Sequence, residues 1–113
     1  MWQRSMALVQ EIYRVTGQFP GDERYGLTAQ LRRSAVSVPS NIAEGHERGA
    51  TRDFMRYLAI AEGSLAEART QLRIGLNLGY CSPGEIERIF NEMTEIKRML
   101  YALRRSLHDR QSR

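Results

Sequence analysis

The sequence predicts an all-α fold, an antiparallel four-helix bundle whose second helix is kinked at Pro39. Apolar residues recur at spacings of three and four in four separate stretches, which is the period of an amphipathic helix. Strand-like alternation is confined to one short run, residues 35–38. Segments containing glycine and proline separate the stretches and mark where helices end. Because 113 residues suffice for one ordinary domain, residues 1–113 are expected to form a single bundle of two packed helical layers.

The first helix is expected from about Trp2 to Thr16, with Gly17 stopping it before a turn at residues 19–22. It carries two apolar stripes, one of Trp2, Met6, Val9 and Tyr13 and one of Leu8, Ile12 and Val15. Together the stripes form a wider face than one neighbouring helix covers. This surplus of apolar surface is one reason to expect an oligomer.

The second helix is expected to begin at Leu27 or Thr28 and to end at residues 44–46. Its inward residues are Leu31, Ala35, Val38 and Ile42. Pro39 lies within this segment, where a proline removes one backbone hydrogen bond and costs ~3 kcal/mol. We therefore expect a kink, or a break into two shorter helices, at residues 37–40.

The third helix is expected to begin at Thr51, a good N-cap residue, and to end at Gly79, with Tyr80 making the apolar contact that accompanies a glycine C-cap. Asp53 would face the positive end of the helix dipole. The inward seam is Phe54, Leu58, Ala61, Leu65, Ala68 and Leu72, and beside it runs a row of small residues, Ala59, Gly63, Ala66 and Thr70. Glycine in a helix costs ~1 kcal/mol relative to alanine, so Gly63 is expected to admit a neighbouring backbone, from within the chain or from another subunit.

The fourth helix has the strongest local start signal. Ser82 is a favoured N-cap, Pro83 suits the first helical position, and Glu85 lies where it closes a capping box. The apolar seam that follows is Ile86, Ile89, Met93, Ile96, Leu100, Leu103 and Leu107. We expect the third and fourth helices to form a long antiparallel hairpin.

Positive charge is concentrated near the C-terminus. Residues 1–96 carry eleven basic and twelve acidic side chains, whereas residues 97–113 carry six basic and one acidic. Sixteen of the seventeen basic residues are arginine, whose planar, weakly hydrated guanidinium suits phosphate and carboxylate recognition. A GC-rich genome produces the same bias, so composition leaves both explanations open.

Three clusters of basic residues are candidates for contact with phosphates. They are Arg32 with Arg33, Arg48 with Arg52 and Arg56, and Lys97 and Arg98 with Arg104, Arg105 and Arg110. A single cluster of this kind is also typical of a solvated helix face. Repeated around a symmetric oligomer, the same cluster neutralises more phosphates and releases more counterions, which favours nucleic-acid binding.

The sequence shows no pattern typical of catalysis or metal binding. Neither His46 nor His108 has, three residues before it, the glutamate that a di-iron site in a helix bundle requires. Cys81 has no histidine or basic residue beside it in sequence, so a structural or incidental thiol is expected. No glycine-rich loop for phosphate or dinucleotide binding is present. We expect a protein that is not an enzyme and that uses no metal or cofactor.

The location expected from the sequence is cytoplasmic, with no membrane partner. No apolar stretch approaches the roughly 20 residues that a membrane span requires. The first ten residues lack the basic, apolar and small-residue order of a signal peptide, and the lone Cys81 cannot form an internal disulfide.

Residues 25–49, YGLTAQLRRSAVSVPSNIAEGHERG, resemble the signature of the four-helix-bundle family named for the 23S rRNA intervening-sequence proteins. The likeness extends to the early Trp, the FP turn before ERYGLT, the stretch FMRYLAIAEGSLAEARTQL and the LGY turn before the last helix, so it covers nearly the whole chain. The resemblance implies a kinked bundle that assembles as a ring-like homopentamer. The best-understood relatives are the accessory variability determinants of diversity-generating retroelements, basic pentameric barrels that bind nucleic acid and a reverse transcriptase.

Two functions fit these features. The first is a non-catalytic oligomeric accessory protein that contacts RNA or DNA phosphates through surface arginines, and that works with a nucleic-acid-processing protein. The alternative is a protein-protein interaction scaffold that binds an acidic or apolar surface and uses its arginines only for solubility. Titration with structured RNA at two salt concentrations separates them, because phosphate contacts weaken steeply with salt.

Overall fold

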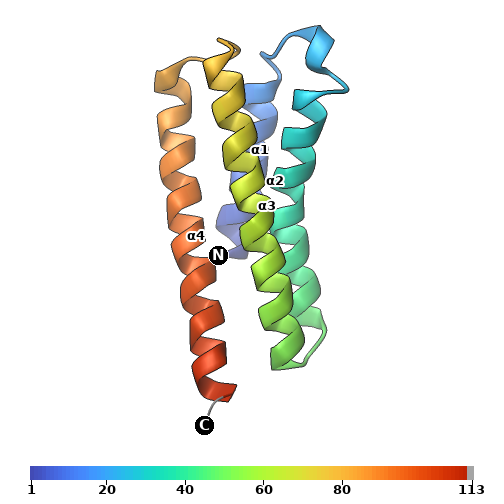
Figure 1. Ribbon diagram of the computed structural model, residues 1–113, viewed down its shortest axis with the longest axis vertical. Coiled ribbons are helices and arrows are strands. Elements are labelled where there is room, and N and C mark those ends of the chain that lie inside the picture. Colours follow the sequence, from blue (N-terminus) through green and yellow to red (C-terminus); the bar gives the residue numbers. More distant parts are fainter. Residues whose placement is uncertain (112–113) are drawn as a thin grey trace.

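A computed structural model describes residues 1–111 and confirms the all-α four-helix bundle (Figure 1). The elements in chain order are α1 (Trp2–Thr16), the short 3-10 helix η1 (Gly21–Glu23), α2 (Leu27–Glu47), α3 (Thr51–Asn77) and α4 (Pro83–Gln111). No β-strand occurs in the described range, and residues 35–38 lie within α2. The four apolar periods in the sequence thus become four helices.

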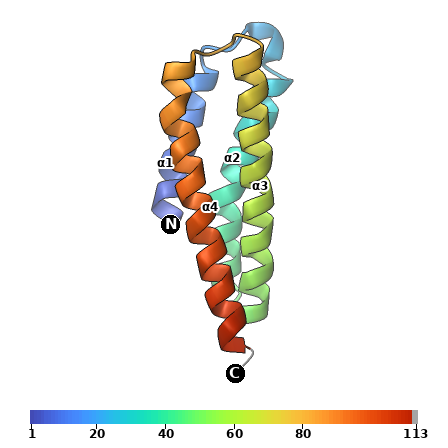
Figure 2. The ribbon, with the colours of Figure 1, turned by 60° about the vertical axis from the view of Figure 1, so that its left-hand side comes forward.

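Each helix packs against the next one in the chain, and α4 closes the bundle by packing against both α3 and α1 (Figures 1 and 2). The closest pairing is between α2 and α3. The resulting molecule is elongated, with extents of 51 × 24 × 19 Å. The expected antiparallel hairpin of α3 and α4 is present in both views.

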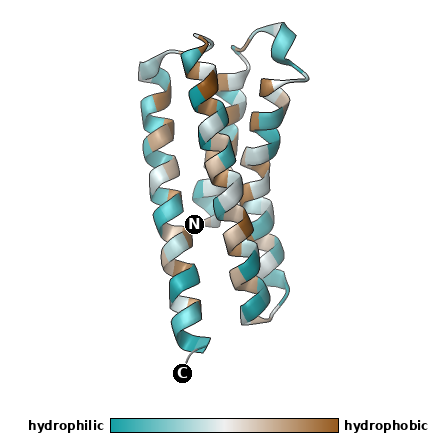
Figure 3. Ribbon diagram, viewed as in Figure 1, coloured by the Kyte–Doolittle hydropathy of each residue, from teal (hydrophilic) through white to brown (hydrophobic). Residues whose placement is uncertain are grey.

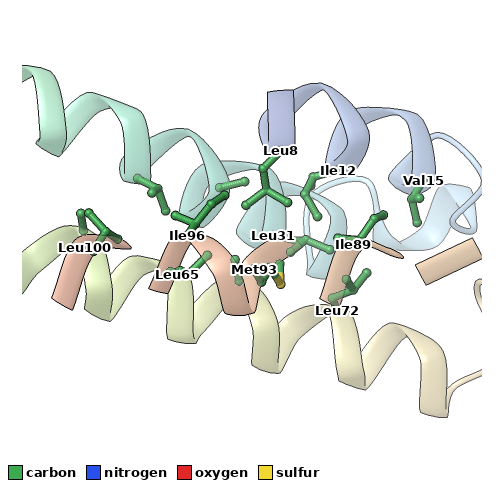
Figure 4. Close-up of a cluster of buried hydrophobic side chains, with 14 of the residues drawn as sticks. Leu8, Ile12, Val15, Leu31, Leu65, Leu72, Ile89, Met93, Ile96 and Leu100 are labelled. Atoms are coloured by element: carbon green, nitrogen blue, oxygen red, sulfur yellow. The ribbon is translucent and has the colours of Figure 1, made fainter. Parts of the chain in front are cut away.

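The core runs along the bundle axis and is made of the predicted apolar seams (Figure 4). Leu8, Ile12 and Val15 of α1 face Leu31 of α2 and Ile89, Met93 and Ile96 of α4, and all of these side chains are at most 1% exposed. Every predicted seam residue of α2, α3 and α4 is buried except Phe54 and Leu103, which are partly buried against the core. Apolar periodicity therefore identified the inward face of each helix correctly.

Helix α1 is shorter than the other three, and its N-terminus lies about halfway along the bundle in both views (Figures 1 and 2). Only one of its two apolar stripes is buried. Trp2, Met6 and Tyr13 of the other stripe remain 45%, 39% and 45% exposed. The surplus apolar surface expected from the sequence is therefore present on the monomer.

Helix α2 continues through Pro39, so the expected break into two helices is wrong, and a bend at that point stays a prediction. Polar side chains near the proline donate to carbonyls of the preceding turn. Ser40 Oγ donates to the Val36 carbonyl at 2.8 Å, and Asn41 Nδ2 donates to the Ser37 carbonyl at 2.8 Å. The bond that Pro39 cannot make is the one to the Ala35 carbonyl, so these side-chain bonds add donors to the two carbonyls that follow it.

The start of α3 differs from expectation. Thr51 is the first helical residue, and Ala50 occupies the N-cap without a side-chain hydrogen bond, so the predicted threonine cap is wrong. The turn before it passes through Gly49 at φ +79°, which leaves Ala50 in the extended conformation that an N-cap adopts. Asp53 still lies in the first turn, as predicted.

The connection from α3 to α4 follows the predicted local signals. Gly79 has φ +79°, the Tyr80 amide donates to the Gly75 carbonyl at 2.9 Å, and the Gly79 amide donates to the Leu76 carbonyl at 3.0 Å. These are the two bonds of a Schellman motif. At the start of α4, the Ser82 and Glu85 side chains bond each other's backbone amides in the predicted capping box, both at 3.4 Å.

Gly63 has no internal neighbour. A Cβ built there would meet no atom within 4 Å, so the internal alternative for this glycine is wrong within the described chain. The close approach occurs instead at Gly45 of α2, where a Cβ would lie 2.6 Å from Tyr57 Cβ and 3.4 Å from Phe54 Cα. Gly45 is therefore what allows α2 and α3 to pack so tightly.

Candidate nucleic-acid interface

The predicted basic clusters come to lie in two parts of the bundle. Arg48, Arg52 and Arg56 lie around the α2–α3 connection, at the same end of the bundle as Arg104, Arg105 and Arg110 of α4 (Figure 1). Residues 43–60 and 103–111 form this part, beyond the start of α1, and we call it the three-helix end. Arg32 and Arg33 lie near the start of α2, in the four-helix end, and do not join the other two clusters.

The charge of α4 changes sign along its length. Residues 83–96 contain four glutamates and one arginine, whereas the described residues 97–111 contain five basic side chains and one aspartate. Helix-dipole interactions favour this polarity but fall off within the last turn. They therefore explain Arg110 and leave Lys97, Arg98, Arg104 and Arg105 without an explanation from the dipole. The second half of α4 is also predominantly hydrophilic in Figure 3.

Arg32 is occupied by the end of α1. Its Nε donates to Thr16 Oγ1 at 2.8 Å, its Nη2 donates to the Tyr13 carbonyl at 3.3 Å, and its guanidinium lies 4.4 Å from the Tyr13 ring centroid. The Tyr13 carbonyl also accepts the Gly17 amide at 3.1 Å, so Arg32 adds a further donor to the end of α1 and ties α2 to it. The structure thus gives Arg32 a role in the fold.

Arg104 is occupied by an ion pair across the α3–α4 interface. Its Nε and Nη2 donate to the two carboxylate oxygens of Glu62, at 2.5 and 3.3 Å. The Glu62 hydrogen bond raises the pKa of the Arg104 guanidinium, which keeps it charged. Arg104 therefore links two helices of the monomer before any ligand arrives.

The remaining arginines of the clusters are held more loosely. Arg48 bonds Glu44 at 2.8 Å and the Tyr57 hydroxyl at 2.9 Å. The Arg56 guanidinium lies over the same Tyr57 ring, 4.9 Å from its centroid. Arg98 pairs with Glu95 at 3.2 Å, with the arginine side chain 73% exposed. Such exposed pairs contribute about 1 kcal/mol at most and exchange readily for other anions.

Four of the predicted basic residues have no partner among residues 1–111. They are Arg33, Arg52, Lys97 and Arg110, and all four are exposed. Lys97 and Arg110 belong to the second half of α4, and Arg52 lies at the start of α3. These side chains are available to bind phosphate without losing an internal contact.

An apolar pocket of about 460 Å³ opens at the junction between the two ends of the bundle. Its lining includes Met1, Trp2, Ile42, His46, Phe54 and Leu103. It lies where α1 begins, and His46 meets Phe54 edge-on, with ring centroids 5.8 Å apart. Sequence periodicity did not reveal this pocket, because its walls depend on how far α1 extends along α2 and α4.

The sequence profile of the 23S rRNA-intervening sequence protein family matches residues 1–102. The chain belongs to this family. Among curated proteins, none matches the sequence. A solved structure of a protein of unknown function from the S23 ribosomal protein family of Bacteroides thetaiotaomicron VPI-5482 is similar, with 24% identity and a TM-score of 0.80. The alignment covers 90% of this chain and 95% of that one, and it supports the fold alone.

In this 23S rRNA-intervening sequence family member, the family match ends before the most basic stretch of α4. Arg104, Arg105 and Arg110 lie beyond residue 102, whereas the α2 and α3 clusters lie within the matched range. The matched range includes Lys97 and Arg98 of the basic half of α4 and stops before the other three basic residues.

The described residues of this family member offer no arrangement suited to metal binding or to a reactive thiol. No group of three or more His, Cys, Asp or Glu side chains in residues 1–111 is placed to hold a metal ion. Cys81 is buried, and its burial raises the pKa of the thiol, which opposes formation of the reactive thiolate. Across residues 1–111, no helix is long and apolar enough to cross a membrane.

Proposed function

We propose that this protein is a non-catalytic, oligomeric accessory protein that binds RNA or DNA through phosphate contacts from arginines. The observation that carries this proposal is the charge of the second half of α4. Residues 97–111 contain five basic side chains and only one aspartate. Arginine binds phosphate through two parallel hydrogen bonds, and each phosphate neutralised releases counterions. The proposed activity is therefore sensitive to salt and indifferent to base sequence.

The basic residues are expected to contribute unequally to phosphate binding. Lys97, Arg98, Arg105 and Arg110 are exposed and bear the main phosphate contacts, together with Arg52, Arg56 and Arg33. Arg32 and Arg104 keep their internal bonds and contribute mainly through their charge. The contributions differ because Arg32 and Arg104 would have to break internal hydrogen bonds to bind a phosphate, whereas the exposed residues would not.

The oligomer is the second part of the proposal, with five subunits as the number that the family resemblance implies. It is supported by the exposed stripe of Trp2, Met6 and Tyr13, and by the open surface over Gly63. Light scattering coupled to gel filtration should give several times the 13.0 kDa of one chain. Trp2 is the sole tryptophan, so dilution below the assembly threshold should shift its emission to longer wavelength. A monomer at micromolar concentration would contradict this part.

The binding experiment compares two triple variants with equal loss of charge. The test variant carries Arg98→Gln, Arg105→Gln and Arg110→Gln, and the control variant carries Arg14→Gln, Arg24→Gln and Arg88→Gln at the four-helix end. Structured RNA is titrated at about 50 and 200 mM salt. Loss of three phosphate contacts predicts a drop of at least tenfold for the test variant, with a shallower salt slope.

The control variant should bind nearly as tightly as the parent, because none of its three arginines is among the proposed phosphate contacts. Equal losses in both variants would mean that only net charge matters and would remove the assignment to α4. If the parent does not bind RNA or DNA, the proposed function fails. The apolar pocket of Met1, Trp2, Phe54 and Leu103 would then favour the alternative, a protein-protein interaction scaffold.

A further inference from the structure

Tyr101 lies at the centre of the basic half of α4. On a helix the nearest surface neighbours of a residue are three and four positions away. For Tyr101 those four positions are all basic, namely Lys97, Arg98, Arg104 and Arg105. No other aromatic residue of the chain has a basic residue at all four positions.

The Tyr101 ring is exposed and has no role in the core. It is 49% exposed and is absent from the apolar cluster that holds the four helices together. Tyr80, by contrast, is partly buried against that cluster. Packing therefore gives no reason for an aromatic side chain at position 101.

Two of the four basic neighbours contact Tyr101. Arg105 Nη1 donates to the Tyr101 hydroxyl at 3.3 Å, and the Arg104 guanidinium carbon lies 5.7 Å from the ring centroid. Among the described residues, neither Lys97 nor Arg98 makes a hydrogen bond or a cation–π contact with it, and Arg98 pairs with Glu95. Open hollows of about 530 and 410 Å³ adjoin the ring, and both are lined by Tyr101, Arg105 and Asp109.

We propose that Tyr101 is a stacking platform for an unpaired base and that the ligand of this surface is single-stranded RNA or DNA. This inference rests on the proposed nucleic-acid binding and names the class of ligand. An aromatic ring within a basic surface provides both parts of single-strand binding, a face for the base and cations for the flanking phosphates. In a duplex the base faces are stacked on one another. The phosphates of a duplex would therefore contact the arginines, and no base would stack on the Tyr101 ring.

The experiment measures fluorescence anisotropy of a labelled 20-nucleotide single strand and of its duplex with the complementary strand. The variants are Tyr101→Ala, Tyr101→Phe and, as a matched exposed tyrosine beside an arginine, Tyr25→Ala. Tyr101→Ala should weaken single-strand binding roughly 5- to 100-fold, the effect of losing one stacked base, and leave duplex binding unchanged. Tyr101→Phe and Tyr25→Ala should bind like the parent.

The salt slope provides a second, independent readout. Tyr101→Ala removes no charge, so its slope should equal that of the parent, whereas Arg105→Gln should have a shallower slope. Because Tyr101 is exposed, circular dichroism should show equal helicity in all variants.

The possible failures are distinct. If the parent binds and Tyr101→Ala binds the single strand as tightly as the parent, or loses equal affinity for the duplex, stacking is overturned and phosphate binding survives. If the parent binds neither strand nor duplex, the proposed function fails together with this inference.

Discussion

The two ends of the bundle are built differently, although α2, α3 and α4 pass through both. The four-helix end is closed on all sides, because α1 fills the space between α2 and α4 (Figures 1 and 2). The three-helix end lacks that neighbour. At ~1.5 Å per residue, the 15 residues of α1 extend ~22 Å and the 29 residues of α4 extend ~44 Å.

Hydrogen bonds between elements reinforce the four-helix end. The Glu23 carboxylate accepts bonds from the Leu27 amide at 3.1 Å and from the Tyr80 hydroxyl at 3.0 Å, so it joins η1, α2 and the α3–α4 connection. Gln18 Nε2 donates to Glu85 at 2.9 Å, which links the end of α1 to the start of α4. Phe19 packs on Tyr80 with ring centroids 5.4 Å apart.

The three-helix end is more open, although Arg104 bonds Glu62 across α3 and α4. Its loop passes through Gly49 without a side-chain cap on α3, and its apolar pocket is open. Two of the four predicted basic residues without a partner among residues 1–111, Arg52 and Arg110, lie there, whereas Arg33 lies in the four-helix end. One end is thus tied together by hydrogen bonds between elements, whereas the other leaves an apolar pocket and basic side chains open to solvent.

The largest expected effect comes from comparing core truncations at the two ends. Ile89 is 1% exposed between α1 and α3, whereas Leu107 is 7% exposed near the end of α4. Ile89→Ala should lower the free energy of unfolding by about 3 kcal/mol, and Leu107→Ala by about 1 kcal/mol, because the looser site can collapse. Urea denaturation at one fixed protein concentration measures both. Equal losses would contradict the division into a closed and an open end.

A second prediction tests whether the three-helix end is nevertheless tight between α2 and α3. Gly45→Ala places a Cβ 2.6 Å from Tyr57 Cβ and should cost about 2 kcal/mol, because the helices must separate. The control is Gly63→Ala, which meets open space and should stabilise the monomer by up to ~1 kcal/mol. If Gly45→Ala had the same thermal unfolding temperature as the parent, α2 and α3 would be able to separate at this contact without loss of stability. A Gly63→Ala variant of smaller oligomeric size would place that glycine in a subunit interface.

The smallest effect concerns the ion pair that ties α1 to α4. Arg4 donates to both oxygens of Glu92 at 2.7 and 2.9 Å, and this hydrogen bonding lowers the pKa of Glu92 below its usual 4.5. The stabilisation is present above that pH and is lost as the pH falls through the lowered value. Because both side chains are more than a third exposed to solvent, we expect well under 1 kcal/mol.

Glu92→Gln should therefore unfold at a slightly lower temperature than the parent at pH 7, and the difference should shrink as the pH falls below 4.5 and through the lowered pKa of Glu92. Glu87→Gln is the matched control, since Glu87 is exposed and makes no bond within residues 1–111. An unchanged difference between Glu92→Gln and the parent from pH 7 to pH 3 would contradict this prediction.

Features that depend on neighbouring residues could be predicted from the sequence. The capping box at Ser82, the glycine C-cap at Gly79 and the inward seams each follow from patterns a few residues long. The same reasoning placed the N-cap of α3 at Thr51, because it could not foresee that the turn at Gly49 leaves Ala50 in the capping conformation.

Features that depend on distant partners could not be predicted. Arg104 and Glu62 are 42 positions apart, and Arg32 reaches back 16 positions to Thr16, so a basic cluster in the sequence does not reveal which of its members are occupied. The pattern around Tyr101 was readable in the sequence, since the i±3 and i±4 positions need only a helix. What the structure added was the exposure of the ring.

The packing of each helix on its neighbour in the chain also has a kinetic consequence. Apart from the contacts of α1 with α4, all helix pairs join elements that follow one another, which is a topology of low contact order. Such chains fold in microseconds to milliseconds, because little loop entropy is lost before contacts form. During synthesis α1, α2 and α3 can associate as they emerge, whereas Ile89 and Met93 reach the core only when α4 is released. The seam between α1 and α4 is therefore expected to be the last to close.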